Sequence, residues 1–136
     1  MSVERPVPVP NAETAPYWAA AREHRLTVQR CLECGQPRFY PRAICPRCGS
    51  DRTEWMDCEG TGTVYSYTVV YRPPSEAFAA DVPYVVAVVE LSEGPHLMTN
   101  VVGCPPDQVT VGMPVRVRFR DMGEELALPL FEPIGT

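Results

Sequence analysis

The second half of the chain consists of short segments with the pattern of β-strands. In the segment 114–120, valine and phenylalanine alternate with three arginines, so the apolar side chains would face one side of a sheet and the arginines the other. Segments rich in β-branched and aromatic residues predict further strands at 63–72, 84–91, 97–102 and 126–131, and a shorter one at 26–29. Pro129 places the last strand at a sheet edge or near its own end. Five short strands with one polar face favour a small Greek-key barrel, commonly an OB-fold.

The N-terminal part of the chain has a different pattern. Its first 13 residues, rich in Pro, Val and Glu, predict an extended arm. Thr14 can cap a helix, and a short helix is predicted from there to about His24. A helix of about three turns is not stable alone in water, so we expect its aromatic residues, Tyr17 and Trp18, to bury against another surface.

Two Cys-x-x-Cys pairs lie between the helix and the barrel strands. They are Cys31 with Cys34 and Cys45 with Cys48, and ten residues separate them. Two residues between thiols allow both sulfurs of a pair to bind one ion from a tight turn, and a tetrahedral zinc site needs two such pairs. A glycine follows each second cysteine, where a positive φ would turn the chain and direct backbone N–H groups at the thiolates. The pattern predicts a zinc ribbon in which residues 38–41 form a strand.

Other readings of these cysteines are disulfides, a rubredoxin-like iron site, and a redox Cys-x-x-Cys. The linker of ten residues is shorter than the usual spacing of such zinc sites. Two complete pairs are nevertheless hard to explain by redox chemistry, and thiolates suit both zinc and iron. We predict a structural Zn²⁺, because protein ligands fill all four positions and leave none for water or substrate. Cys58 and Cys104 fall at strand ends and are predicted to be small buried residues rather than nucleophiles.

Charge is unevenly distributed along the chain, whose net charge is −5 over 136 residues. Residues 22–52 contain seven arginines against three acidic residues, and residues 57–136 contain four arginines against eleven. Such asymmetry relates to partners rather than to the fold. No apolar segment approaches the length of a membrane span, and the N-terminus does not have the pattern of a secretory signal. We therefore expect a cytoplasmic protein in a reducing compartment, where disulfides are rare.

The sequence does not contain a recognisable catalytic set. His24 falls at the predicted helix end, and His96 follows Gly94-Pro95 in a predicted hairpin turn. Neither belongs to a nucleophile–base signature, and neither a Gly-x-Ser-x-Gly motif nor a phosphate-binding glycine loop is present. As an isolated enzyme the chain is poorly equipped.

Several motifs occur in an order that resembles a known family. They are Pro16-Tyr17-Trp18, Gln29-Arg30-Cys31-x2-Cys34-Gly35, Pro41-Arg42, Cys45-Pro46-x-Cys48-Gly49, Trp55, Gly60 to Thr68, Arg72-Pro73-Pro74, Pro83-Tyr84 and Gly112-Met113-Pro114-Val115. In this order they resemble the acyl-CoA-associated zinc-ribbon and OB-fold proteins, first catalogued as domain-of-unknown-function family thirty-five. The likeness extends over about residues 15–131.

The resemblance implies a mainly β protein with an N-terminal arm and helix (1–29), a rubredoxin-like zinc ribbon (30–56) and a five-stranded OB-fold barrel (57–136). It implies a non-catalytic accessory or scaffold subunit in a hetero-oligomer with a thiolase-like subunit of the sterol-carrier-protein thiolase type. That subunit would bind the acyl-CoA and supply the catalytic residues, for thiolysis or for aldol cleavage in lipid, steroid or aromatic metabolism.

The resemblance also suggests which residues meet the partner and the CoA. The partner contacts that it implies are Tyr17, Trp18, Arg42 and Phe78. Arginines suited to the phosphates of CoA, which the subunit could help to frame, are Arg38, Arg47 and Arg72.

Single-stranded nucleic-acid binding is the alternative function, because zinc ribbons and OB-folds often serve it. Arg116, Arg118 and Arg120 could line such a groove. The barrel half is strongly acidic, however, and the pI of the chain is about 5, so a nucleic-acid partner is not expected. Electron transfer through iron at the four cysteines is a third possibility.

Overall fold

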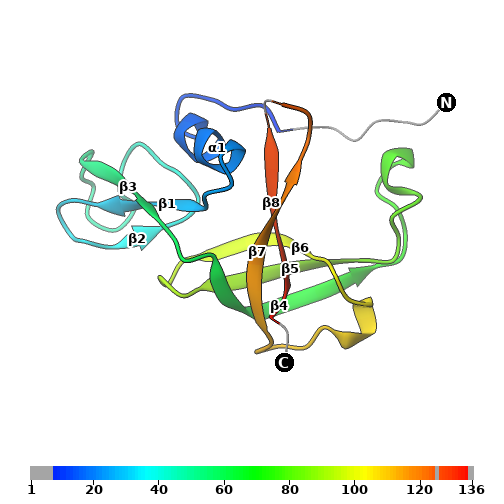
Figure 1. Ribbon diagram of the computed structural model, residues 1–136. Helices are drawn as coiled ribbons and strands as arrows, with labels where there is room; N and C mark the ends of the chain where they lie inside the picture. Colours follow the sequence, from blue (N-terminus) through cyan, green and yellow to red (C-terminus); the bar gives the residue numbers. More distant parts are fainter. Residues whose placement is uncertain (1–7, 125, 135–136) are drawn as a thin grey trace.

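The computed structural model describes residues 8–124 and 126–134. Within them a single α-helix precedes two β-sheets (Figure 1). The elements are α1 (Ala15–Arg22), β1 (Thr27–Cys31), β2 (Pro37–Arg38), β3 (Thr53–Asp57), β4 (Thr61–Val70), β5 (Tyr84–Leu91), β6 (His96–Val101), β7 (Pro114–Asp121) and β8 (Ala127–Pro133), with 3-10 helices η1 (Glu76–Phe78) and η2 (Pro106–Gln108). Strands β2-β1-β3 form a three-stranded sheet, and β4-β5-β6-β8-β7 form a closed barrel. The predicted mainly β fold with a five-stranded barrel is confirmed.

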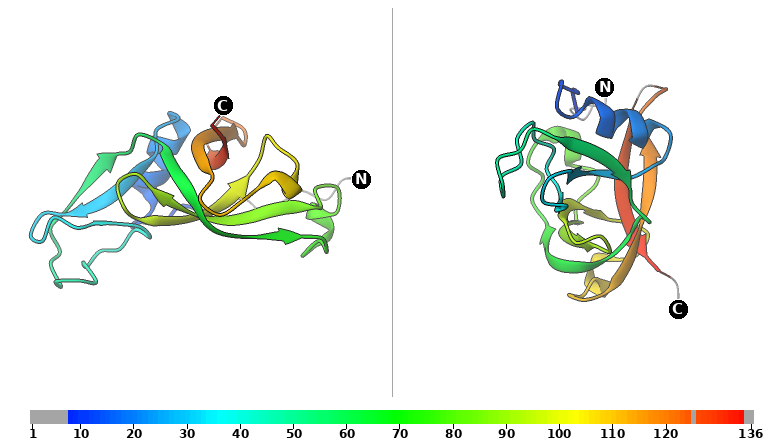
Figure 2. Two further views of the ribbon diagram at one scale, coloured as in Figure 1. Left: turned by 90° about the horizontal axis from the view of Figure 1, so that it is seen from below. Right: turned by 90° about the vertical axis from the view of Figure 1, so that its left-hand side faces the viewer.

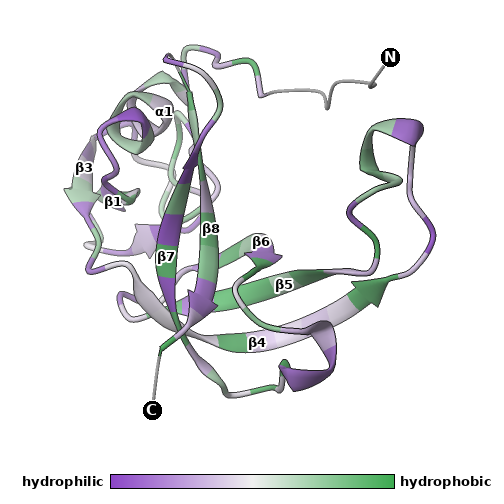
Figure 3. Ribbon diagram, turned by 45° about the vertical axis from the view of Figure 1, so that its right-hand side comes forward, coloured by the Kyte–Doolittle hydropathy of each residue, from purple (hydrophilic) through white to green (hydrophobic). Residues whose placement is uncertain are grey.

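The barrel is antiparallel except at one seam. Strands β4 and β5 pair along most of their length, with a bulge between Val64 and Ser66, and β7 pairs with β8 over seven residues. Strand β6 meets β8 in parallel at a single pair, Val101 with Phe131. Phe131 is fully buried among apolar side chains from β4 to β7. The alternation predicted for β7 is visible as successive green and purple bands in Figure 3.

Strand β4 begins at Thr61, two residues before the predicted start. Gly62 explains how the sheet closes there, because a Cβ at this position would lie 2.3 Å from the backbone oxygen of Glu90. Only glycine allows β4 and β5 to approach so closely. The strand pairs on its other side with β7 through Thr61, Gly62 and Thr63, which completes the barrel.

The ribbon sheet differs from the prediction in two places. The strand expected at 38–41 is reduced to Pro37–Arg38, and the next residue, Phe39, packs against Tyr17 of α1. A third strand, β3, was not predicted, and its five residues pair with β1 from Thr27–Asp57 to Cys31–Thr53. Figure 2 shows the ribbon at one end of an elongated molecule and the barrel at the other.

Helix α1 packs against both the ribbon and the barrel, and these two parts of the chain cover its buried side. Tyr17 is only 5% exposed; its ring packs edge-on against Trp18 and at a tilt against Phe39 of the ribbon. Burial raises the pKa of the Tyr17 hydroxyl far above its ordinary value. The helix contacts β1 and β8. The prediction that Tyr17 buries is confirmed, and in the chain itself the ribbon and the barrel cover it.

The end of the helix is joined to the barrel by His24. The helix ends at Arg22, and His24 adopts a positive φ of 62°. Its ring stacks on Phe119 of β7 with 5.2 Å between ring centroids, and its Nε2 lies 2.7 Å from Asp121 Oδ1. Thr14 does not cap the helix with its side chain; its hydroxyl accepts the N–H of Asn11 instead. Of the predicted arm, residues 1–7 lie outside the described residues.

A membrane-spanning helix would need about 20 apolar residues. No helix in the described part of the chain is long and apolar enough for this.

Candidate metal centre and the surfaces around it

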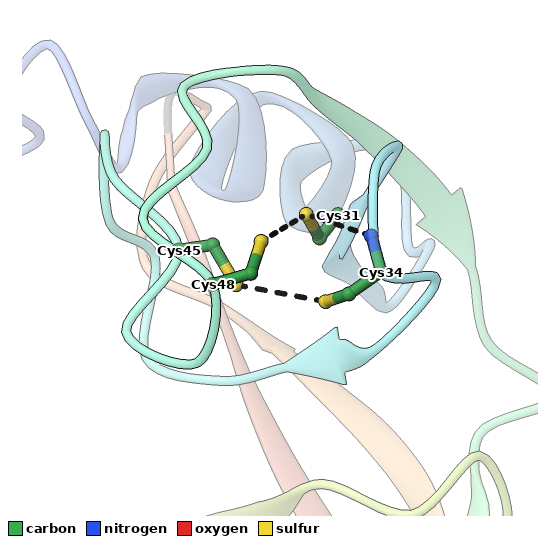
Figure 4. Close-up of side chains that lie close together, drawn as sticks. All are labelled: Cys31, Cys34, Cys45 and Cys48. Carbon is green, nitrogen blue, oxygen red and sulfur yellow. Dashed lines mark hydrogen bonds between the residues drawn. The ribbon is translucent and has the colours of Figure 1, made fainter.

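The four cysteines of the two pairs come together between two loops of the ribbon (Figure 4). Cys31 ends β1, and the loop that follows contains Cys34; Cys45 and Cys48 lie in the loop that leads to β3. Both loops fold alike, because the N–H of Gly35 donates to the carbonyl of Cys31 and that of Gly49 to the carbonyl of Cys45, each at 2.9 Å. These glycines have φ values of 75° and 80°, as predicted, a conformation that side chains rarely adopt.

The sulfur atoms have the spacing of a tetrahedral metal site. Sγ of Cys31 lies 3.5 Å from that of Cys48, Sγ of Cys34 lies 3.9 Å from that of Cys45, and all four lie within 4.8 Å of one another. Four thiolates at about 2.3 Å from a central zinc would be about 3.8 Å apart. The residues therefore fit a four-coordinate metal, and the predicted ligand set forms one cluster.

Backbone N–H groups direct positive charge at two of the thiols. The N–H of Cys34, aided by that of Glu33, lowers the pKa of Cys31 to about 6 against the opposing effect of burial. The N–H of Cys48 likewise lowers the pKa of Cys45. The N–H of Ser50 acts in the same direction on Cys48, but hydrogen bonds with the neighbouring sulfurs and burial outweigh it and raise that pKa to about 12. Four thiolates this close repel one another, and a divalent cation would supply the charge that allows all four to ionise.

The remaining two cysteines are separate from this cluster. Burial, and then the nearby Glu93 carboxylate, raise the pKa of Cys58 to about 12. Burial and Asp107 raise the pKa of Cys104. Both thiols are half-buried and pack against the apolar core. A raised pKa disfavours the reactive thiolate, which agrees with the prediction that neither is a nucleophile.

The two histidines have structural neighbours. His24 is bound to Asp121 and Phe119, as described above. His96 is the first residue of β6 rather than part of the preceding turn, and its ring lies 4.4 Å from that of Tyr65. Within residues 8–124 and 126–134, neither histidine forms a hydrogen bond with a serine or cysteine.

The predicted partner residues are not gathered on one surface. Trp18 is half-buried at the junction of helix, ribbon and barrel. Arg42 is exposed, and its backbone N–H donates to Gln29 Oε1 at 2.7 Å. Phe78 belongs to η1, in the loop between β4 and β5, and its ring lies 6.1 Å from that of Tyr84. This loop extends from the side of the barrel away from the ribbon (Figure 1).

The three arginines predicted for CoA are also separated. Arg38 is only 7% exposed, and its Nη2 donates to the carbonyl of Arg42 and to Thr53 Oγ1 inside the ribbon. A guanidinium buried in this way supports the fold of the ribbon. Arg47 is exposed and donates to Gln36, and Arg72 is exposed just after β4.

The arginine stripe of β7 is exposed, as its alternation predicts. Glu132 of β8 neutralises part of it, lying 3.1 Å from Arg116 and 3.5 Å from Arg118. Two of the three cations are therefore paired, which weakens the case for a nucleic-acid groove on this strand.

A groove of about 380 Å³ lies where the helix, the ribbon and the barrel meet, and sequence reasoning did not find it. Its walls come from α1, from the segment after β2, and from β6 and β8. Two of the lining residues, Tyr17 and Trp18, are partner contacts predicted from the sequence. Tyr17 is buried, and Trp18 is half-buried. A second hollow of about 300 Å³ adjoins it and shares Asn100 and Leu130, but it is lined partly by Asp81 and Arg120.

Comparison with known proteins agrees with this architecture, a small metal ribbon followed by an OB-fold. The rubredoxin-like zinc ribbon domain of ChsH2 matches residues 18–54, and the C-terminal OB-fold domain of ChsH2 matches residues 55–120. A DUF35 domain-containing scaffold protein of Methanothermobacter thermautotrophicus is 38% identical over 83% of this chain and 86% of its own length. The chain therefore belongs to the DUF35 family of ChsH2-type zinc-ribbon and OB-fold proteins, which confirms the resemblance found in the sequence.

Two further relatives have names that refer to enzymes. A probable enoyl-CoA hydratase alpha subunit of Thermomonospora curvata is 46% identical over 95% of this chain, but the chain spans only 40% of that protein. A chain of the solved Ltp2-ChsH2(DUF35) aldolase is 45% identical, with a TM-score of 0.84 over 93% of this chain and 98% of that one. A DUF35 protein of Sulfolobus solfataricus has the same fold at 16% identity, with a TM-score of 0.64.

Proposed function

We propose that the protein is a non-catalytic scaffold subunit that stabilises an acyl-CoA-processing enzyme complex. The partner would be a thiolase-like subunit of the sterol-carrier-protein thiolase type, which binds the acyl-CoA and supplies the catalytic residues. The observation that carries the proposal is the match over nearly the full length of both chains to a chain of the Ltp2-ChsH2(DUF35) aldolase. The contacts of His24 with Asp121 and Phe119, and of His96 with Tyr65, suit structural roles for both histidines.

Zinc would act in this subunit as a structural cross-link. Cys31, Cys34, Cys45 and Cys48 would hold it. The spacing of the four sulfurs and the lowered pKa values of Cys31 and Cys45 support this assignment. The ion supplies positive charge and four bonds that fix two loops with little regular structure. A cytoplasmic location, where thiols stay reduced, suits such a site.

The residues most suited to contact the partner are Trp18, Arg42 and Phe78, and those most suited to the phosphates of CoA are Arg47 and Arg72. Arg42, Arg47 and Arg72 are exposed, as a guanidinium must be to form bidentate hydrogen bonds with carboxylate or phosphate groups. Arg42 and Arg47 belong to the ribbon, whereas Arg72 and Phe78 belong to the loop between β4 and β5, on the side of the barrel away from the ribbon (Figure 1). A partner that contacted all of them would extend along the molecule.

A hydratase is the second candidate partner. The relative from Thermomonospora curvata is named a probable enoyl-CoA hydratase alpha subunit and contains a region 46% identical to this chain. A scaffold that binds both a hydratase and a thiolase-like enzyme would hold together two enzymes that act on CoA thioesters.

Purification of the tagged chain from its native host, followed by mass spectrometry and size-exclusion chromatography, tests the proposal. We expect a thiolase-like protein or a hydratase in stoichiometric amount, and acyl-CoA cleavage or hydration by the complex that the isolated chain lacks. A Cys45→Ser chain serves as the control, since its ribbon would lose a metal ligand. A wild-type chain that elutes as a free monomer with its metal bound would contradict the proposal.

A further inference from the structure

The groove between helix, ribbon and barrel is notable for what lines it. It contains no acidic or basic side chain among its lining residues, in a chain of which 21% of the residues are charged. Aromatic and aliphatic side chains dominate, with Trp18 and Tyr40 on one side and Met98 and Leu128 on the other. Tyr40 is 53% exposed and Met98 71% exposed, so two large apolar side chains face solvent. Exposed apolar groups that gather at one place commonly mark a binding surface.

The ribbon wall of the groove is held in place by three hydrogen bonds. Arg38 Nη2 donates to the carbonyl of Arg42 at 3.0 Å, and the N–H of Arg42 donates to Gln29 Oε1 at 2.7 Å. The next N–H, of Ala43, donates to Glu13 Oε2 at 2.7 Å. These bonds fix the segment that contains Tyr40 before anything binds, which reduces the entropy lost on association.

The barrel wall is fixed in a similar way. Strands β6 and β8 separate below their single pair, and the Thr99 hydroxyl bridges them by donating to the carbonyl of Pro129 at 3.0 Å. Pro129 does not have an N–H with which to continue the ladder. The opening of the seam is therefore part of the folded structure, and it exposes Leu128 and Leu130 to the groove.

The absence of charge and the open rim indicate the class of occupant. A CoA nucleotide or a nucleic acid requires cations, which the groove lacks. A small apolar molecule is usually enclosed on most sides, whereas Tyr40 and Met98 remain largely exposed here. Uncharged centres with exposed aromatic and methionine side chains are typical of protein interfaces.

We propose that this groove binds an uncharged, apolar side-chain cluster of the partner subunit and is the central contact of the complex. The inference rests on the proposed function, because it takes the scaffold role as given and assigns the contact to a surface. Of the partner contacts predicted from the sequence, the groove retains Trp18. It adds Tyr40, Met98 and Leu128 as contacts that the sequence did not predict. The groove depends on the ribbon, so metal binding and docking are linked through the segment after β2.

A charge placed in the groove tests the assignment. In Met98→Arg the new cation is solvated in the free chain, since residue 98 is exposed. When the partner subunit docks, the cation would be buried without an opposite charge to pair with. Val111→Arg is the matched control, because Val111 is 67% exposed and lies outside the groove lining. With the co-purified thiolase-like or hydratase subunit as the probe, calorimetry should show at least about 30-fold weaker binding for Met98→Arg and wild-type affinity for Val111→Arg. Hydrogen exchange should show that residues 39–41 and 96–99 become protected in the wild-type complex.

Other results would overturn the inference in distinguishable ways. Equal affinities for the two variants would reject the groove and leave the scaffold function intact, whereas a wild-type chain without any enzyme partner would reject both. A dimer of the isolated chain that sediments as such and is lost in Met98→Arg would assign the groove to a second copy. Saturable binding of sodium dodecanoate, lost in Met98→Arg while partner affinity is unchanged, would assign it to a small apolar ligand.

Discussion

Truncation of Tyr17 to alanine is the sharpest test of how the ribbon and barrel are joined. Tyr17 is 5% exposed and belongs to the same apolar cluster as Val28 of the ribbon and Phe131 of the barrel. Its ring also lies 5.0 Å from that of Trp18 and 5.3 Å from that of Phe39. The side chain therefore packs against rings of the helix and the ribbon within the cluster that includes the barrel core, and its removal should loosen all three.

The expected loss can be worked from this environment. Replacing a buried large aromatic residue by alanine costs about 3–5 kcal/mol, since it removes apolar contacts and leaves a cavity. For a chain of 136 residues, an unfolding entropy of about 2.1 cal/mol/K per residue converts this to a fall in Tm of roughly 10–18 °C. The matched control is Tyr71→Ala, because Tyr71 is 72% exposed. Its truncation should change stability by no more than about 0.5 kcal/mol.

Calorimetry of the metal-loaded chain and both variants measures these effects. The Tyr17→Ala chain should show the large fall in Tm and a lower free energy of unfolding in urea, and Tyr71→Ala should match the wild type. If Tyr17→Ala melted within about 2 °C of Tyr71→Ala, the helix would not be packed on the ribbon and barrel as described. A partner subunit would then be needed to cover Tyr17.

Three further predictions concern the barrel, the thiols and the groove. Gly62→Ala should destabilise the chain by more than Gly112→Ala in urea titrations, because the new Cβ at position 62 would lie 2.3 Å from the backbone oxygen of Glu90. A Cβ at position 112 meets no atom within 4 Å, so that variant bears only the strain of its positive φ of 89°. The folded-state pKa of Cys31, about 6, lies below its ordinary 9.0, so the thiolate's contribution to the stability of the metal-free chain is present above pH 9 and is lost as the pH falls to 6. The difference in the free energy of unfolding between wild type and Cys31→Ser should therefore shrink as the pH falls over this range, and a constant difference would contradict the lowered pKa. Chelation of the metal should abolish partner binding in pull-down assays without unfolding β4 to β8, as monitored by amide exchange, and a complex that survives chelation would separate docking from the ribbon.

The metal site could be predicted from the sequence because its signal is local. Each pair of cysteines needs only two intervening residues and a following glycine, and both glycines have the positive φ values that the pattern requires. The barrel strands were also predictable, since alternation reports directly on which face is buried. Strand β3 was missed because its residues, Thr53–Asp57, are all exposed or half-buried and do not alternate clearly.

What could not be predicted is how distant segments meet. The sequence shows that Tyr17 must bury, but not that the covering surfaces lie within the same chain. Arg38 looks like any other arginine of a basic segment, and only the folded ribbon shows that it is buried between Arg42 and Thr53. The groove combines α1, the ribbon and two barrel strands, β6 and β8, that β7 separates in the sequence, so no window of residues could contain its pattern.

Metal analysis of the purified protein, combined with X-ray absorption at the zinc edge, tests the central claim most directly. The account predicts one zinc per chain, bound by four sulfurs at about 2.3 Å, and loss of that zinc in Cys45→Ser. A metal-free chain whose β1 to β3 amides are still protected from exchange would contradict it.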